Sequence, residues 1–248
     1  MRTVVVGASS GLGRCIGVGL GEGGAQVALL ARRHDRLVDA AKQAGPGSLA
    51  IACDVTDESS CAGAIEEAAK GLGGIDAVVY AAGIGPLVRL VDTDAATWRQ
   101  TFDTNVIGAA RITAAAIPYL TESGGTVAYL SSVSASLTPP WPGLGAYTVS
   151  KAALDKLVEA WRIEHPGVGF TRVVVGDCAG GQGDAATQFA SGWDTELASQ
   201  LGPQWLAGGY IVGTLLPVDE LVRVVDSVLR CGGDASVPSV IVTPRRPA

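Results

Sequence analysis

Tyr147 and Lys151 stand four residues apart near the start of a predicted helix over residues 146–164. Side chains with this spacing lie one turn apart on the same helix face, so the phenol and the amine can act together. The pKa of a free tyrosine is about 10, too high for acid–base work at neutral pH, but a neighbouring ammonium favours the phenolate. Tyr147 is therefore a candidate acid–base residue, with Lys151 as the group that tunes its pKa.

Serine hydroxyls precede this pair at the carboxyl end of a predicted strand over residues 126–130, where the chain reads Leu130-Ser131-Ser132-Val133-Ser134. A hydroxyl at such a place can polarise a substrate carbonyl by donating a hydrogen bond to its oxygen. We assign this role to Ser132 by its place in the run. Ser134 remains the alternative and is also expected in the substrate pocket.

Three glycines lie in the run GASSGLG, residues 7–13, between the first predicted strand and the first predicted helix. Residues without a Cβ let backbone N–H groups and the positive end of the helix approach a pyrophosphate. The same run also spells G-x-S-x-G, the nucleophile elbow of an α/β-hydrolase, with Ser9 as the nucleophile. A hydrolase would need a downstream histidine as base, and the chain offers only His34 and His165.

About twenty residues past this turn, where a dinucleotide site distinguishes its cofactors, stand Arg32 and Arg33. Arginines there favour a 2′-phosphate, hence NADP(H) over NAD(H), although they would equally suit a solvated cluster with Asp35. Asp54 and Val55 follow the third predicted strand. The Asp54 carboxylate is expected to accept a hydrogen bond from adenine, with a helix N-cap as the alternative.

In this order and at these spacings, the motifs resemble those of the short-chain dehydrogenase/reductases, in the branch of about 250 residues. The resemblance covers essentially the whole chain. It implies that Tyr147 donates the proton in carbonyl reduction and that Ser132 binds the carbonyl oxygen. It further implies that Lys151 holds the nicotinamide ribose and lowers the Tyr147 pKa, and that Asn105 anchors a proton-relay water through the lysine.

The resemblance also implies a cofactor site assembled from several turns. Its expected members are Gly7, Ser9, Ser10, Gly11, Leu12, Gly13, Arg32, Arg33, Asp54, Val55, Ala81, Ala82, Gly83, Asn105, Tyr147 and Lys151. No metal site is expected. A homotetramer or homodimer built on helices that flank the sheet is the assembly that the resemblance implies.

The chain departs from the family's pattern at three places. Residues 80–83 read Tyr-Ala-Ala-Gly in place of Asn-Asn-Ala-Gly, so the asparagine side chains that would brace adjoining strands are absent. Ser134 lies thirteen residues before Tyr147, a common family interval, whereas Ser132 lies fifteen before it. Residues 175–181, VGDCAGG, stand where the family usually has Pro-Gly and then a threonine that touches the nicotinamide amide.

Short β-rich runs alternate with longer helical stretches along the chain. Several runs, such as TVVV and SVIV, are continuously apolar, as strands buried on both faces of a parallel sheet require. We therefore predict an α/β fold, a single Rossmann-type doubly wound domain over residues 1–248 with a seven-stranded parallel sheet. The predicted strands are 3–6, 26–30, 48–53, 77–80, 126–130, 171–175 and 239–242, and the predicted helices are 12–21, 35–44, 58–72, 95–119, 146–164 and 219–229.

Residues 176–217 are irregular, with one helical suggestion around 195–206. Because ligands bind outside the carboxyl ends of the strands in such sheets, we expect a substrate lid over residues 178–215, with a surface excursion as the alternative. The expected substrate pocket contains Ser134, Trp141, Leu144 and Trp193, and Phe189 and Trp205 are further candidates for its lining. Its aromatic members suit an apolar ketone or secondary alcohol, and would equally suit ordinary core.

The chain has 18 Lys and Arg against 24 Asp and Glu, a net charge of −6, which opposes broad contact with nucleic acid or anionic membranes. Its five cysteines form no C-x-x-C pair, so neither a disulfide framework nor a thiolate zinc site is expected. The first residues do not resemble a signal peptide, and no apolar run reaches about 18 residues. We expect a cytoplasmic protein.

Together these features predict an NADP(H)-dependent oxidoreductase that transfers a hydride between nicotinamide and a small-molecule carbonyl or alcohol, with Tyr147 as the acid and base. The altered segment at residues 176–181 motivates a second hypothesis, a dinucleotide-binding regulatory protein without turnover. The serine hydrolase remains a third.

Overall fold

The centre of the computed structural model, which describes residues 1–211, 213–231 and 235–245, is a seven-stranded parallel sheet. The strand order β3-β2-β1-β4-β5-β6-β7 confirms the predicted doubly wound fold. The strands are β1 (Arg2–Val6), β2 (Gln26–Ala31), β3 (Leu49–Ala52), β4 (Ala77–Tyr80), β5 (Thr126–Ser132), β6 (Gly169–Val175) and β7 (Ser239–Val242).

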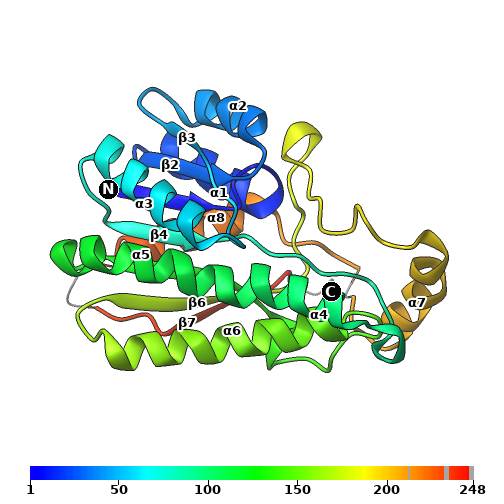
Figure 1. Ribbon diagram of the computed structural model, residues 1–248. Helices are drawn as coiled ribbons and strands as arrows, with labels where there is room; N and C mark the ends of the chain where they lie inside the picture. Colours follow the sequence, from blue (N-terminus) through cyan, green and yellow to red (C-terminus); the bar gives the residue numbers. More distant parts are fainter. Residues whose placement is uncertain (212, 232–234, 246–248) are drawn as a thin grey trace.

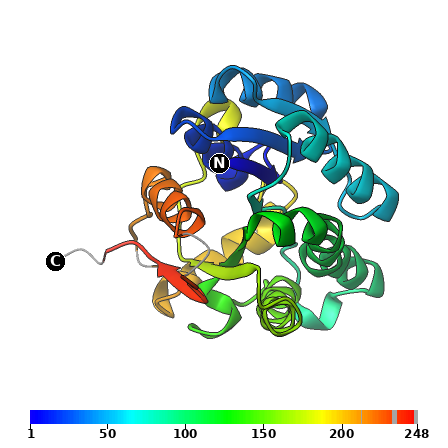
Figure 2. The ribbon, with the colours of Figure 1, turned by 90° about the vertical axis from the view of Figure 1, so that its left-hand side faces the viewer.

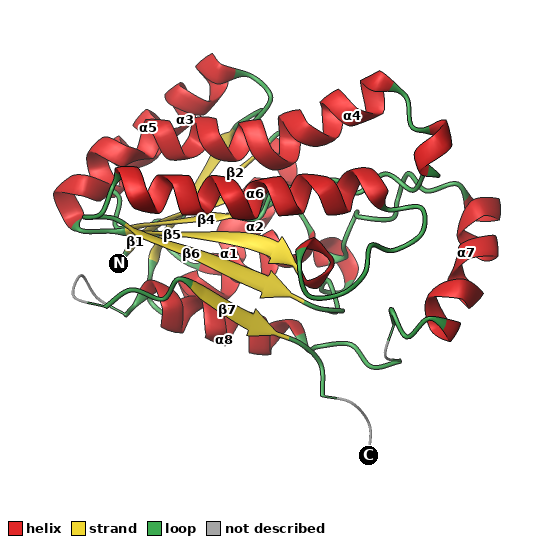
Figure 3. Cartoon of the chain, turned by 90° about the horizontal axis from the view of Figure 1, so that it is seen from below, coloured by secondary structure: helices red, strands yellow, loops and turns green. Residues whose placement is uncertain are grey.

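Helices cover both faces of the sheet (Figures 1 and 2). One layer holds α1 (Gly11–Glu22), α2 (His34–Ala44) and α8 (Val218–Leu229), and the other α3 (Glu58–Leu72), α5 (Gly108–Ser123) and α6 (Gly145–Glu164). A further helix, α7 (Thr195–Ala207), lies on the side toward which the strand arrowheads point in Figure 3. Within the described ranges, no helix has the length and apolar character needed to cross a membrane.

Continuous apolar runs form the strands because successive side chains enter opposite layers of the core. Val4 and Val6 of β1 pack with α3 and α5, whereas Val5, between them, packs with α1 and α8. All three side chains are fully buried. A strand with two buried faces requires this composition, and the expectation from the TVVV run is confirmed.

The stretch predicted as one helix over residues 95–119 is divided in the structure. It consists of α4 (Ala95–Phe102), a π-helical turn (Asp103–Ile107) and α5, which continues to Ser123. A π-turn adds a residue without breaking the helical direction, so the apolar spacing of the sequence does not reveal it. This turn sets the direction of Asn105.

Glycines in α1 allow the helix to lie close to its neighbours. A Cβ built at Gly17 would lie 2.5 Å from Leu29 Cδ2, and one at Gly21 would lie 2.4 Å from the backbone oxygen of Ala44 in α2. Both distances are shorter than a Cβ tolerates. Close packing of α1 against β2 and α2 therefore offsets the poor helix propensity of its glycines.

We expect Gly21→Ala to lower the free energy of unfolding by about 1–3 kcal/mol, because the added methyl meets the α2 backbone. Gly63→Ala is the matched control, since Gly63 lies within α3 and a Cβ there meets nothing within 4 Å. The control should instead raise the free energy of unfolding by about 0.5–1 kcal/mol, because alanine has the higher helix propensity. Urea denaturation measures both, and a stabilised Gly21→Ala protein would contradict the packing argument.

Candidate active site

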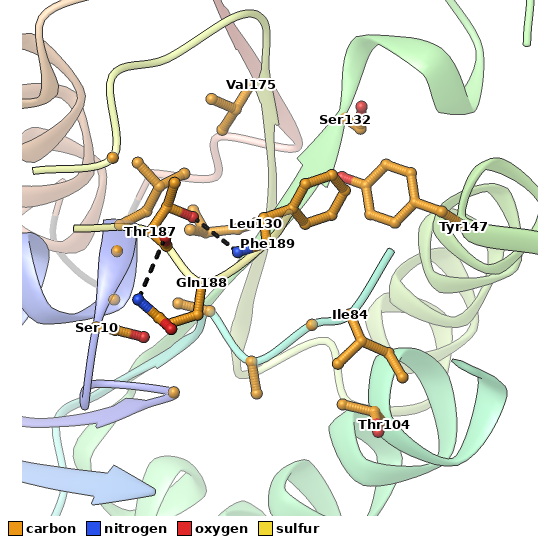
Figure 4. A pocket seen from close by; sticks show the side chains of 18 of the residues that line it. Ser10, Ile84, Thr104, Leu130, Ser132, Tyr147, Val175, Thr187, Gln188 and Phe189 are labelled. Carbon is orange, nitrogen blue, oxygen red and sulfur yellow. Dashed lines mark hydrogen bonds between the residues drawn. The ribbon is translucent and has the colours of Figure 1, made fainter. Parts of the chain in front are cut away.

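A cleft of about 760 Å³ opens at the carboxyl edge of the sheet, between the ends of the central strands and the segment that follows β6. The predicted cofactor and pocket residues all line it, apart from Asn105. Figure 4 shows part of this lining, with Ser10 on one side and Tyr147 on the other. The structure thus brings the glycine turn and the Tyr147–Lys151 pair into one cavity.

The glycine turn has the geometry that a bound pyrophosphate requires. Gly7 adopts a φ of +86°, and a Cβ there would lie 2.6 Å from the backbone nitrogen of Ala82. A Cβ at Gly13 would lie 2.4 Å from the carbonyl oxygen of Gly7. Ser10, the N-cap of α1, makes no side-chain cap, and the first turn of α1 carries no acid. An anion would therefore meet the positive end of α1 without a competing carboxylate.

Arg33 leaves the end of β2 and turns toward this glycine turn. Its Nη2 atom donates to Ser9 Oγ at 2.9 Å and to Ser10 Oγ at 2.8 Å. Partial burial lowers the Arg33 pKa, and repulsion from Arg36 and Arg32 lowers it further, so an anion there would relieve an unfavourable gathering of charge. No ion pair joins Arg33 to Asp35 within the described part of the chain.

The same contacts oppose the hydrolase hypothesis. Ser9 Oγ accepts from Arg33, which remains charged and cannot serve as a general base. His165 follows α6 and packs on Trp161 with ring centroids 5.4 Å apart, just before β6 begins, at the other edge of the sheet. Ser9 therefore has a cationic partner in place of the histidine that a nucleophilic serine needs.

Asp54 lines the cleft and does not cap the following helix. Its Oδ1 atom accepts from the Thr56 backbone nitrogen at 2.9 Å and from Thr56 Oγ1 at 2.7 Å. These two hydrogen bonds lower the Asp54 pKa. The N-cap of α3 is Asp57, whose carboxylate accepts from the Ser60 nitrogen. Asp54 is thus an ionised acceptor, held in place at the rim.

Lys151 is buried at the centre of the site, with an exposed fraction of 5%. Its Nζ atom donates to the Leu130 carbonyl oxygen at 2.7 Å and lies 5.8 Å from the centroid of the Tyr147 ring. Burial lowers the Lys151 pKa to about 8, although the negative charge of Asp155, one turn further along α6, opposes this shift. The ammonium is therefore close to losing its proton under mildly alkaline conditions.

Tyr147 differs from the expectation based on its neighbour alone. Burial raises the Tyr147 pKa above its ordinary value, and a hydrogen bond with Ser132 only partly offsets this. Desolvation penalises the charged phenolate, so the chain by itself holds Tyr147 as a neutral phenol. A neutral phenol is the form that can donate a proton to a carbonyl oxygen.

The two candidate serines lie together at the end of β5. Ser132 Oγ and Ser134 Oγ are 3.0 Å apart, and the Ser134 backbone nitrogen donates to Ser132 Oγ. Both side chains are buried and both line the cleft. Ser132 is the one that bonds Tyr147, which favours it for the carbonyl oxygen and leaves Ser134 to orient its hydroxyl.

Asn105 does not line the cleft, because its side chain is buried behind the lining and engaged in hydrogen bonds there. Its Oδ1 accepts from the Ile84 nitrogen at 2.8 Å, and its Nδ2 donates to the Ile84 oxygen at 2.9 Å and to Ser150 Oγ at 2.8 Å. Asn105 therefore ties the loop after β4 to α6. This clamp braces the region in which Tyr80 and Ala81 stand in place of the family's asparagines.

The irregular segment after β6 returns to the cleft with Phe189, an expected pocket residue, and with Thr187 and Gln188, which the sequence analysis missed. Thr187 faces the glycine turn, where a Cβ at Gly11 would lie 3.4 Å from Thr187 Oγ1. Figure 4 shows Thr187 and Gln188 near Ser10, and Phe189 beside Tyr147. The available signal was Thr187, a threonine that lies later than the family's pattern places one after the sixth strand. The lid predicted over residues 178–215 includes residue 212, which lies outside the described residues.

Comparisons with known proteins agree with this geometry. A family model described as short chain dehydrogenase matches residues 2–190. Short chain dehydrogenase mpl6 of Monascus purpureus is 31% identical over 238 residues, 92% of this chain and 71% of that protein. 11-beta-hydroxysteroid dehydrogenase A of Sesamum indicum is 33% identical over 179 residues, 70% of this chain and 51% of that protein. The chain thus spans about half the length of several curated relatives.

Solved structures agree as well. The crystal structure of a short-chain type dehydrogenase/reductase from Mycobacterium marinum superposes with a TM-score of 0.83 at 26% identity, covering 98% of this chain and 93% of that one. A short-chain dehydrogenase from Streptomyces avermitilis superposes with a TM-score of 0.79 at 27% identity, covering 97% of this chain and 87% of that one. The protein belongs to the short chain dehydrogenase family.

The buried ammonium predicts a pH-dependent stability. Since the folded pKa of Lys151 is about 8 against an ordinary 10.5, the unfolded chain binds more protons between these values, and stability rises with pH across this window. We expect a gain of up to about 3 kcal/mol, from about 1.4 kcal/mol per pKa unit, that Lys151→Met lacks. Urea denaturation of both proteins at pH 7 and pH 10 measures it.

Lys156→Met is the matched control, because Lys156 is an exposed lysine on the same helix. It should keep the pH dependence of the unaltered protein. If Lys151→Met kept that dependence too, the depressed Lys151 pKa would be wrong.

Proposed function

We propose that the protein is an NADP(H)-dependent oxidoreductase that moves a hydride between nicotinamide and the carbonyl or secondary alcohol carbon of an apolar small molecule. One observation carries this proposal: a single cleft joins the glycine turn and Arg33 to Ser132, Tyr147 and Lys151. We also propose one domain, a homo-oligomer of two or four chains, and a cytoplasmic location.

The cofactor would lie along the carboxyl edge of the sheet. The first turn of α1 suits its pyrophosphate, Asp54 and Val55 its adenine, and Lys151 its nicotinamide ribose. Arg33, held by Ser9 and Ser10 at the end of β2, supports NADP(H), because a guanidinium there can pair with a 2′-phosphate.

The reaction assigns one task to each side chain. A bound nicotinamide supplies the hydride for reduction and accepts it for oxidation. In reduction, Tyr147 donates its phenolic proton to the carbonyl oxygen while Ser132 donates a hydrogen bond to the same oxygen. The Lys151 ammonium then stabilises the phenolate. Asn105 positions this group by fixing the loop at Ile84 and, through Ser150, the start of α6.

Calorimetric titration of the protein with NADPH and with NADH tests the cofactor. One charge-assisted contact is worth about 1.5–3 kcal/mol, so NADPH should bind roughly 10- to 150-fold more tightly. Arg33→Ala should remove most of this preference, whereas Arg223→Ala, which removes an exposed arginine from α8, should keep it. Tighter binding of NADH would contradict the proposal.

Tyr147→Phe tests the acid. Loss of a general acid typically slows the chemical step by about 10²–10⁴-fold. We expect kcat for the reduction of a ketone to fall by a factor in this range, while the affinity for NADPH stays unchanged. Tyr119→Phe, which alters a phenol of α5 away from the cleft, should leave kcat unchanged. Steady NADP+ formation by the unaltered protein would exclude the regulatory hypothesis, and an undiminished rate in Tyr147→Phe would refute the assignment.

A further inference from the structure

The side chain of Phe189 occupies the approach to the catalytic phenol. Its ring meets Tyr147 edge-on, with centroids 5.1 Å apart and planes at 73°. On its other side it meets Trp193 in the same manner at 5.6 Å. Figure 4 shows the Phe189 and Tyr147 rings next to each other, with Ser132 close to the phenol. A substrate carbonyl that reaches Tyr147 must therefore take space that Phe189 now fills.

Gly85 gives this space its shape. A Cβ at Gly85 would lie 2.1 Å from Phe189 Cζ and 2.3 Å from Cε2, so the ring rests directly on the glycine backbone. Trp193 Nε1 donates to the Gly85 carbonyl oxygen at 2.8 Å and fixes the opposite wall. Tyr147, Gly85 and Trp193 thus bound a slot that accepts one aromatic ring, which we call the ring slot.

The surroundings of the ring slot favour an uncharged occupant. Beyond it, Trp193 meets Trp205 at 5.8 Å and Trp205 meets Trp141 at 5.7 Å. The apolar cluster under α7 continues these walls with leucine side chains. Aromatic rings gain from edge-to-face contacts that a saturated ring of similar size does not make.

Phe189 belongs to a segment that is weakly held to the rest of the protein. The hydrogen bonds that the described structure shows for residues 182–191 all end within residues 182–193. Thr187 and Gln188 are exposed although they line the cleft. The segment can therefore withdraw its phenyl ring without breaking a hydrogen bond to the rest of the described chain, while Trp193 keeps its hydrogen bond to Gly85.

We propose that the ring slot is the substrate subsite for an aryl group, and that Phe189 fills it until an aryl ketone or aryl carbinol takes its place. This inference rests on the proposed function, because it places the ring next to the carbonyl that Tyr147 protonates. The carbonyl carbon then lies between the aryl ring and the phenol of Tyr147. The substrate class is thus an uncharged aromatic ketone or the corresponding alcohol.

Steady-state reduction with NADPH tests this inference with three ketones of matched size: acetophenone, cyclohexyl methyl ketone and 2-octanone. We expect kcat/KM for acetophenone to exceed that for cyclohexyl methyl ketone about threefold to tenfold, the gain that edge-to-face contacts give. Phe189→Ala should lower the KM for acetophenone at an unchanged kcat, because the competing ring is gone. Gly85→Ala should lower kcat/KM for acetophenone at least about tenfold and affect slender 2-octanone less.

Leu206→Ala, an exposed position on α7, is the control and should leave all three ketones unchanged. A higher KM for acetophenone in Phe189→Ala would show that Phe189 is a fixed wall and would overturn the inference. Equal efficiency for all three ketones would also overturn it while the proposed function stands.

Saturation-transfer NMR with acetophenone and NADP+ tests whether the ring slot binds an aryl group when no ketone is turned over. Saturation transfer to the acetophenone ring that vanishes in Gly85→Ala, without turnover of any ketone, would support the ring slot and refute the proposed function. No binding and no turnover of acetophenone would overturn the ring slot.

Discussion

The parallel register of the central strands places distant parts of the chain at one edge. Val6, Tyr80 and Tyr129 lie in one row across β1, β4 and β5, so the glycine turn, the loop after β4 and the Ser132 run all begin at the same level. In an antiparallel sheet these segments would leave at opposite ends. The glycine turn and the Tyr147–Lys151 pair meet in one cleft because of this register, and the other residues of the site lie around them.

A second constraint is the buried amine of Lys151, which needs a hydrogen-bond acceptor and space within the fold. The Leu130 carbonyl oxygen accepts its hydrogen bond, and Gly83 lies beside it, where a Cβ would be in ordinary van der Waals contact with Lys151 Nζ and Asn105 Oδ1, 3.5 Å from each. Burial that weakens the ammonium also keeps Tyr147 protonated. Under the proposed function, this burial lowers the stability of the fold and keeps Tyr147 ready to donate its proton.

The sequence was sufficient for the sheet and for most of the cleft, because both depend on local patterns. Continuous apolar runs indicate buried strands, and the glycines of α1 indicate close packing. The π-turn at Asn105 was missed because apolar spacing continues through it. Thr187 was missed because a long irregular segment has no periodicity, and its contact with Gly11 spans many residues. Phe189 was expected in the pocket, but its contact with Tyr147 was not predicted. The Tyr147 pKa depends on desolvation, which only packing determines.

Hydride transfer in this cleft is tested most directly with NADPH that carries deuterium at the transferred C4 position, by mass spectrometry of the alcohol formed from a ketone. We expect one deuterium on the carbinol carbon for each labelled NADPH oxidised, and a strongly slowed formation of labelled alcohol in Lys151→Met. Oxidation of NADPH without a labelled alcohol would contradict it. So would tight cofactor binding with no transfer to any ketone.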